Sequence, residues 1–120
     1  MKNLKTIKLN KEYKRAYFQG SYKAHPLVVT YLIKNGLLEN RIGITTSKKI
    51  GKAFARNRAR RIIRAAYLNI RQQLSFETGY DIVFVARADT AKAKSSDLEP
   101  ILIKQIQFLL SLKIKKKKYK

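Results

Sequence analysis

Ser47 to Arg64 reads Ser-Lys-Lys-Ile-Gly-Lys-Ala-Phe-Ala-Arg-Asn-Arg-Ala-Arg-Arg-Ile-Ile-Arg. This stretch dominates the charge pattern of the 120-residue chain, because the segment from Arg41 to Arg71, both included, holds ten basic residues and no acidic residue. Neither Gly nor Pro occurs from Lys52 to Leu74. Both residues disfavour helix interiors, so their absence predicts one long helix over this segment.

The predicted helix has two opposed faces. On a helical wheel with about 100° per residue, one face is an apolar stripe suited to packing on a sheet. That stripe consists of Ala59, Ile62, Ile63, Ala66 and Ile70. The other face is basic and holds Asn57, Arg60, Arg61, Arg64 and Arg71, with Leu68 among them.

A solvated surface is the simplest explanation for a basic helix, but the energetics of this helix argue against it. Arg56 with Arg60, Arg60 with Arg64, Arg58 with Arg61 and Arg61 with Arg64 are like-charge pairs at i,i+3 or i,i+4. Together they cost roughly 1 to 2 kcal/mol, and the helix contains no acid to offset them. Arginine also makes bidentate phosphate contacts that lysine cannot make. The helix therefore indicates a polyanionic partner.

The flanking segments predict an α+β fold with one sheet and helices packed against it, a two-layer sandwich. We expect one domain, residues 1–120, with flexible basic ends at about 1–8 and 114–120. The element order is α-β-β-α-β-α. The elements are a helix from Asn10 to about Phe18 closed by a left-handed Gly20, strands 27–33 and 41–46 as an antiparallel hairpin, the long helix, a central strand 81–87, and a helix from Pro100 to about Lys113.

Composition narrows the possible functions. With 28 Lys plus Arg against 7 Asp plus Glu, the formal net charge is +21, which favours nucleic acid as the partner. The chain has no Cys and one His, and its acids are scattered, which argues against thiol chemistry, structural zinc and a paired-acid active site. No apolar run reaches the roughly 18 residues of a membrane span, so we expect a cytoplasmic protein.

The central stretch resembles the signature of the bacterial ribonuclease P protein subunit family. That signature is a Lys-Lys-x-Gly segment followed by an Arg-Asn-Arg core and further arginines. The flanks match as well, and the resemblance covers nearly the whole chain. The matching residues are Lys48, Lys49, Gly51, Arg56, Asn57, Arg58, Arg60, Arg61 and Arg64 in the signature, and Tyr13, Tyr17, Gly20, Tyr31, Arg41, Gly43 and Arg87 in the flanks.

The resemblance implies a protein that assists a catalytic RNA in removing the 5′ leader of precursor tRNA. The protein would be the non-catalytic subunit of a ribonucleoprotein endoribonuclease, a hydrolase of tRNA processing. Mg²⁺ would be bound mainly by the RNA, with none bound by the protein alone. The implied partners are the catalytic RNA and precursor tRNA, with no membrane and no obligate protein partner. The implied fold is a ribosomal S5 domain 2-like sandwich with a left-handed β-α-β crossover.

Two groups of site residues follow from the resemblance. The residues expected to contact the catalytic RNA are Lys52, Arg56, Asn57, Arg58, Arg60, Arg61 and Arg64. A cleft for the single-stranded leader is expected from Tyr13, Tyr17, Tyr31, Thr45, Lys48, Lys49 and Arg87. Stacking on aromatic rings tolerates many sequences, which suits leaders that differ from one precursor to the next. Core packing remains the alternative for each tyrosine.

Four residues depart from the family pattern. Ala65 stands where the family usually has Glu or Gln, Phe54 replaces a smaller valine, and Tyr13 and Tyr17 replace phenylalanines. None of these changes removes a group expected to contact RNA. Two other functions remain open: a structural RNA-binding protein of a ribosome-associated particle, which needs no leader cleft, and a cationic binder of membrane surfaces, which needs exposed bulky apolar residues.

Overall fold

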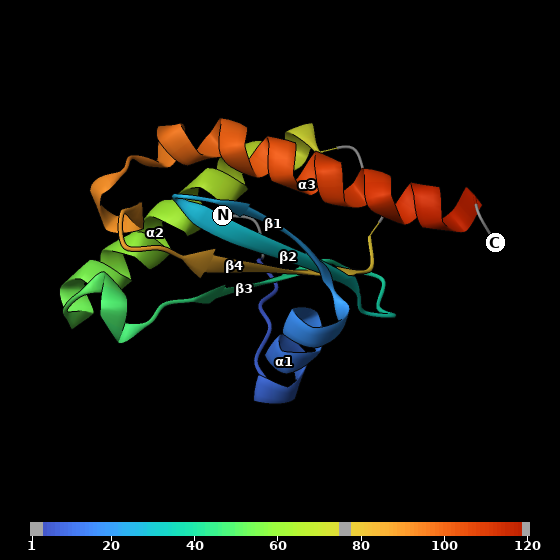
Figure 1. Ribbon diagram of the computed structural model, residues 1–120, viewed down its shortest axis with the longest axis horizontal. Coiled ribbons are helices and arrows are strands. Elements are labelled where there is room, and N and C mark those ends of the chain that lie inside the picture. Colours follow the sequence, from blue (N-terminus) through green and yellow to red (C-terminus); the bar gives the residue numbers. More distant parts are fainter. Residues whose placement is uncertain (1–3, 75–77, 119–120) are drawn as a thin grey trace.

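The computed structural model describes residues 4–74 and 78–118, with side chains described as far as residue 112. A four-stranded sheet lies between α1 on one side and α2 and α3 on the other (Figure 1). The elements are α1 (Asn10–Gln19), β1 (Ser21–His25), β2 (Val28–Lys34), β3 (Arg41–Thr45), η1 (Lys48–Ile50), α2 (Ala53–Ile70), η2 (Arg71–Gln73), β4 (Tyr80–Ala86), η3 (Thr90–Lys92) and α3 (Ser95–Lys118).

The strands lie in the order β1-β2-β4-β3, so the last strand in the sequence is an inner strand of the sheet. β4 runs antiparallel to β2 and parallel to β3. Helix α2 connects β3 to β4. Its side chains are buried except for the half-buried Val85, as expected for an apolar strand covered on both faces. The predicted α+β sandwich and central strand are confirmed.

The predicted order of elements lacks one strand. The order in the structure is α-β-β-β-α-β-α. β1 is an edge strand, Ser-Tyr-Lys-Ala-His, and its three middle residues are exposed. A strand with so little buried surface lacks the apolar alternation by which strands are recognised. Its pairing with β2 leaves only Pro26 and Leu27 between the two strands.

The predicted hairpin between residues 27–33 and 41–46 is wrong, because β4 lies between β2 and β3. The loop that follows β2 is tied to β4 instead of forming a tight turn. The Asn35 N–H donates to the Gly79 carbonyl at 2.8 Å, and the Asn35 side-chain oxygen accepts the Leu37 N–H at 2.8 Å. The hairpin is formed by β1 and β2.

Two helix ends differ from the prediction. Gly20 ends α1 with φ of −79°, so the left-handed conformation expected there is wrong. Glycine is required at this position by close packing, since a Cβ would lie 2.5 Å from the Ala16 carbonyl oxygen and 2.9 Å from that of Leu32. α3 begins at Ser95 and continues to Lys118, so Pro100 lies inside the helix.

The predicted flexible ends lie partly on described residues. Residues 1–3 and 119–120 lie outside the described part of the chain, whereas residues 4–9 are placed against β3. Thr6 forms a parallel bridge with Ile42, and Ile7 is buried and donates its N–H to the Ile42 carbonyl at 2.8 Å. This segment therefore covers the edge of β3.

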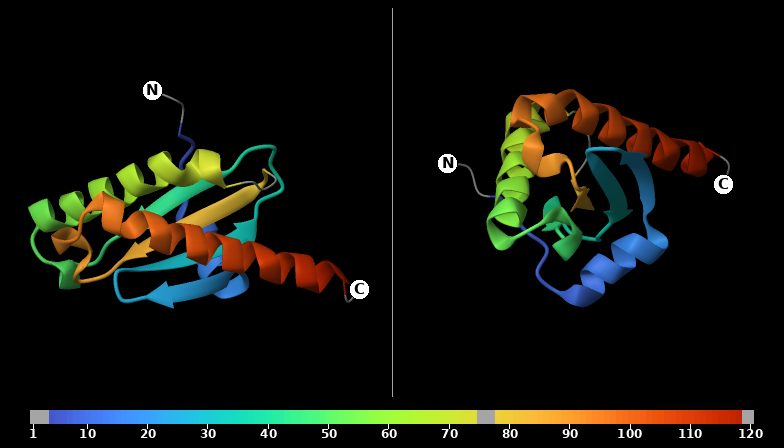
Figure 2. Two further views of the ribbon diagram at one scale, coloured as in Figure 1. Left: turned by 90° about the horizontal axis from the view of Figure 1, so that it is seen from above. Right: turned by 60° about the vertical axis from the view of Figure 1, so that its left-hand side comes forward.

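Helices α2 and α3 lie on one side of the sheet and α1 lies on the other (Figure 2). The sheet separates two hydrophobic clusters, one beneath α2 and α3 and one beneath α1. Alternate residues of each strand point to opposite faces, so β2 sends Val28 and Leu32 to the larger cluster and Ile33 to the smaller one. On α2 the predicted apolar stripe is buried, apart from the half-buried Ile62. α1 contributes Ala16 to the smaller cluster.

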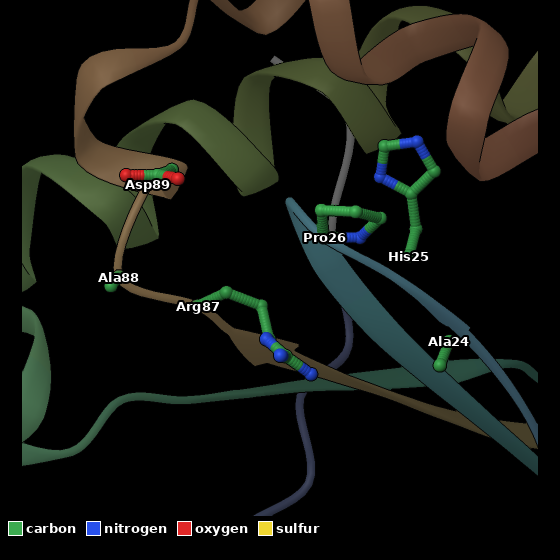
Figure 3. Close-up of a pocket in the computed structure, with 6 residues that line it drawn as sticks. All are labelled: Ala24, His25, Pro26, Arg87, Ala88 and Asp89. Carbon is green, nitrogen blue, oxygen red and sulfur yellow. The ribbon is translucent and has the colours of Figure 1, made fainter.

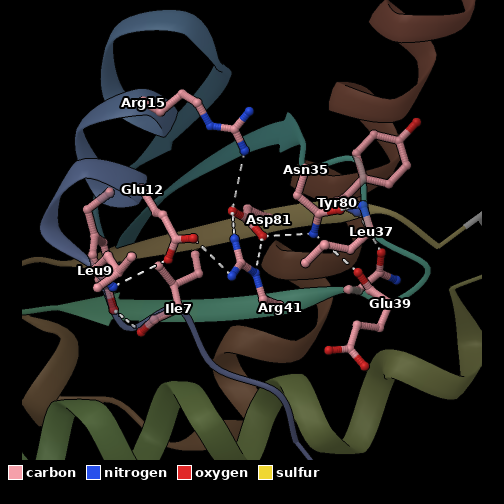
Figure 4. Close-up of polar contacts among 12 residues, drawn as sticks. Ile7, Leu9, Glu12, Arg15, Asn35, Leu37, Glu39, Arg41, Tyr80 and Asp81 are labelled. Carbon is pink, nitrogen blue, oxygen red and sulfur yellow. Dashed lines mark hydrogen bonds and ion pairs between the residues drawn. The ribbon is translucent and has the colours of Figure 1, made fainter.

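A buried carboxylate, Asp81, ties α1 to the sheet (Figure 4). Arg41 donates to both Asp81 oxygens, at 2.9 and 2.8 Å, and the Asn35 amide donates at 2.9 Å. From α1, Glu12 pairs with Arg41 at 3.1 Å and Arg15 lies 3.7 Å from Asp81. Hydrogen bonding to Asp81 raises the pKa of Arg41 above its ordinary value. This network fixes α1 over one end of the sheet.

We predict that Asp81→Asn lowers the free energy of unfolding by about 3 kcal/mol, because it leaves the largely buried Arg41 guanidinium without its full counter-charge. Urea unfolding measures the change. Asp89→Asn is the matched control: its pair with Lys92 is 3.8 Å apart and exposed, so we expect a loss below about 0.5 kcal/mol. Equal losses for the two variants would contradict the role assigned to Asp81.

Candidate RNA interface

α2 displays its basic residues over the end of the sheet at which β3 and β4 finish. Gly51, with φ of 135°, turns the chain away from η1, and Ala53 begins the helix after Lys52. The first turns of α2 extend past the ends of β3 and β4 (Figure 1). Because the helix buries its apolar stripe against the sheet, its opposite face remains in solvent.

Most of the predicted RNA-contacting residues form one exposed surface, which we call the arginine face. Arg56 and Arg60 lie at its margin and are half-buried. In the described part of the chain no residue pairs with the side chains of Arg61 and Arg64, so both guanidinium groups are available to a ligand. The arginine face consists of Lys52, Asn57, Arg58, Arg61 and Arg64.

Arg60 points toward the sheet, although the helical wheel placed it on the outward face. Its Nη1 donates to the Ile44 carbonyl at 3.1 Å and its Nη2 to the Thr46 hydroxyl at 2.9 Å. A residue at the margin of a helix face can reach the end of the strand beneath it, and a free strand carbonyl is a strong acceptor. Arg60 therefore fastens α2 to the end of β3.

Two further arginines are held by backbone carbonyls. Arg56 Nη1 donates to the Gly51 carbonyl at 2.8 Å, and Arg58 Nε donates to the Ala91 carbonyl of η3 at 2.8 Å. Each guanidinium has five N–H donors, so one bond to the protein leaves others for a phosphate. These bonds orient the side chains and reduce the entropy lost when a phosphate is bound.

The predicted leader-binding tyrosines lie on the opposite side of the sheet, next to α1. Tyr13 and Tyr17 project from α1, and the Tyr13 ring lies over Gly43, where a Cβ would approach it to 2.5 Å. Burial raises the pKa of Tyr13, with Tyr17 adding to the shift, so the phenol stays neutral. The Tyr17 hydroxyl donates to the Thr45 hydroxyl at 3.2 Å. The fold thus brings Tyr13, Tyr17 and Thr45 close together.

Three rings continue across the sheet as what we call the tyrosine row: Tyr17, Tyr31 and Tyr22. The centroids of Tyr17 and Tyr31 are 5.1 Å apart in an edge-on contact, and those of Tyr31 and Tyr22 are 5.5 Å apart with planes tilted by 30°. Tyr17 and Tyr31 are half-buried, whereas Tyr22 is 60% exposed. The row becomes more exposed toward the β1 edge.

The sequence prediction did not include Tyr22, because it lies on the unrecognised strand β1. Its place in the row follows from the register, in which Tyr22 is paired directly with Tyr31. A usable signal was present: Pro26 favours the first central position of a turn, and a two-residue loop after His25 pairs Tyr22 with Tyr31.

The remaining predicted residues lie at the end of the sheet, between the arginine face and the tyrosine row. β3 and β4 are parallel, so Lys48 and Lys49, after β3, lie toward the same end of the sheet as Arg87, after β4. All three side chains are exposed. Arg87 also lines a cavity of about 440 Å³ with His25, Pro26 and Asp89, beside the β1–β2 turn (Figure 3).

Within the described residues, no three His, Cys, Asp or Glu side chains group together as a metal site would require. The same part of the chain contains no helix that is both long enough and apolar enough to cross a membrane.

Known proteins resemble this chain in both sequence and fold. The model of the Ribonuclease P family matches residues 1–109. The ribonuclease P protein component of Clostridioides difficile (strain 630) is 41% identical over 96 residues, which are 79% of this chain and 82% of that protein. The component from Caldanaerobacter subterraneus subsp. tengcongensis is 38% identical over 104 residues, 87% of this chain and 88% of that protein.

The comparison of structures points to the same family as the comparison of sequences. The solved structure of the RNase P protein from Staphylococcus aureus superposes with a TM-score of 0.69 at 26% identity, over 92% of this chain and 95% of that one. Because the family model spans most of the chain and the sequence and fold comparisons agree with it, the chain belongs to the Ribonuclease P protein family.

Proposed function

We propose that this chain is the protein component of a ribonuclease P, binding a catalytic RNA through the arginine face and the 5′ leader of precursor tRNA along the tyrosine row. The observation that carries the proposal is the presence of an exposed arginine-rich surface and a row of aromatic rings on opposite sides of one small sheet. A protein that only bound a structural RNA would need the first surface and not the second.

The arginine face suits a folded RNA. Its charges are fixed to a helix and are not opposed by any acid from Ala53 to Ile70, so they attract phosphates. Asn57 adds an amide that both donates and accepts hydrogen bonds, which fits a 2′-hydroxyl or a base edge. We infer that this face holds the catalytic RNA.

The tyrosine row suits a single strand. Bases in a single strand are free to stack on aromatic rings, at about 1 to 3 kcal/mol per base and with little sequence preference. Lys48, Lys49 and Arg87 lie toward the end of the sheet where they would meet the phosphates of such a strand. Because many different leaders must be accepted, this form of recognition matches the proposed task.

The RNA would supply the chemistry in this proposal. We expect the RNA to hold the Mg²⁺ on which the chemistry would depend. The protein would bind the two RNAs and align them. The cytoplasmic location expected from the sequence stays a prediction.

The proposal is tested by adding the protein to the catalytic RNA and precursor tRNA at low Mg²⁺ and measuring the rate of leader removal. We expect a clear increase, because the protein supplies positive charge and leader contacts that high Mg²⁺ would otherwise replace. A protein that binds RNA without raising the rate would be a structural RNA-binding protein instead.

For the arginine face, we predict that Arg61→Ala weakens binding of the catalytic RNA and reduces the slope of log K against log salt by about one unit, as expected for one lost phosphate contact. Equilibrium binding over a range of salt concentrations measures both quantities. Lys104→Ala, an exposed cation on α3, is the control and should leave the slope unchanged. An unchanged slope for Arg61→Ala would show that this side chain faces solvent in the complex.

For the tyrosine row, we predict that Tyr22→Ala weakens binding of precursor tRNA roughly 5- to 150-fold, the equivalent of about 1 to 3 kcal/mol for one lost stacking contact. Binding of mature tRNA should hardly change, since it lacks the leader. Tyr22 is exposed, so the variant should fold normally, and Tyr22→Phe should bind as the unmodified chain does. Equal losses for precursor and mature tRNA would contradict a leader contact.

A further inference from the structure

Phe54 is an exposed aromatic residue in the middle of positive charge. It lies in the first turn of α2, and 73% of it is exposed. It belongs to neither of the two core clusters. Packing within the described part of the protein therefore does not account for an aromatic side chain at this position.

The ring shares a helix face with the residues proposed to bind RNA. Asn57, Arg58 and Arg61 follow Phe54 at i+3, i+4 and i+7, the spacings that place side chains on one side of a helix. All three are exposed. An RNA that contacts Arg58 and Arg61 together would therefore lie next to the Phe54 ring.

The chemistry of the ring limits what can cover it. A phosphate placed against an apolar ring would lose hydration without gaining a hydrogen bond, which is unfavourable. A base gains by stacking on the ring, and the neighbouring arginines would hold the phosphates on either side. In a continuous A-form duplex the base faces are enclosed within the stack, so a duplex cannot offer this contact.

We propose that Phe54 stacks on an unpaired nucleobase of the RNA bound by the arginine face, so that this face recognises a loop, bulge or junction. This inference rests on the proposed function and adds to it, because charge alone would bind any RNA helix. The arginines supply affinity that depends on salt, whereas Phe54 supplies affinity and selectivity that do not.

Binding assays with Phe54→Ala, Phe54→Leu and Phe54→Tyr test the proposal, using the full chain with two probes: the catalytic RNA and a fully paired RNA duplex. We expect Phe54→Ala to weaken binding of the catalytic RNA about fivefold or more, with an unchanged salt slope and unchanged duplex binding. Phe54→Tyr should bind as the unmodified chain does, because it keeps the ring. Phe54→Leu should bind as weakly as Phe54→Ala, although it keeps much of the apolar surface.

Two controls separate the outcomes. Phe18→Ala removes an aromatic that is 83% exposed and lies on neither proposed surface, and it should leave binding unchanged. Arg61→Ala tests the arginine face by itself. If Arg61→Ala weakens binding but Phe54→Leu binds like the unmodified chain, the stacking proposal is wrong and the proposed function stands. If neither variant affects binding of the catalytic RNA, the arginine face does not bind it, and both proposals fail.

Discussion

The buried carboxylate of Asp81 is the constraint on which the arrangement of the two proposed RNA surfaces depends. It binds Arg41 of β3 through two hydrogen bonds and Asn35 through a third, and Arg15 of α1 lies nearby. A buried acid is stabilising only when it is fully paired, so these partners must stay in place. α1 is thereby fixed over one end of the sheet. The rest of that sheet face is left for Tyr31 and Tyr22.

The two surfaces differ in the physical basis of their binding. Charge dominates the arginine face, and several of the basic residues around it are oriented by backbone carbonyls before any ligand arrives. Aromatic rings dominate the tyrosine row, where affinity depends little on salt or sequence. Lys48, Lys49 and Arg87 lie toward the end of the sheet that separates the two surfaces. Under the proposed function, this small domain would hold a folded RNA and a single strand at the same time.

The sequence predicted those features that repeat along the chain. The two faces of α2 and the apolar run of β4 follow from local periodicity, which records whether a residue meets core or solvent. β1 was missed, because an exposed edge strand lacks the alternation of apolar and polar residues that marks a half-buried strand. The pairing of β2 with β4 was missed as well, since the interposed strand comes from more than 40 residues later in the chain. Of the candidate site, Tyr13, Tyr17, Tyr31 and Thr45 lie together, whereas Lys48, Lys49 and Arg87 lie toward the end of the sheet and Arg60 turns inward to β3. Tyr22 was not predicted.

What the sequence determined by itself is the chemistry of the surfaces: a helix with an uncompensated arginine face, tyrosines spaced to share one side of a helix, and a strongly positive chain. Only the tertiary structure decided how these parts are used. It turned Arg60 inward to the end of β3, aligned Tyr22 with Tyr31, and buried Asp81 beneath Arg41. The Tyr22–Tyr31 contact follows from the β1–β2 hairpin, for which Pro26 is a local signal. Arg41 and Asp81 are 40 residues apart, and Arg60 and Ile44 are 16 apart, so these two contacts form only once the sheet has formed and no local pattern in the sequence encodes them.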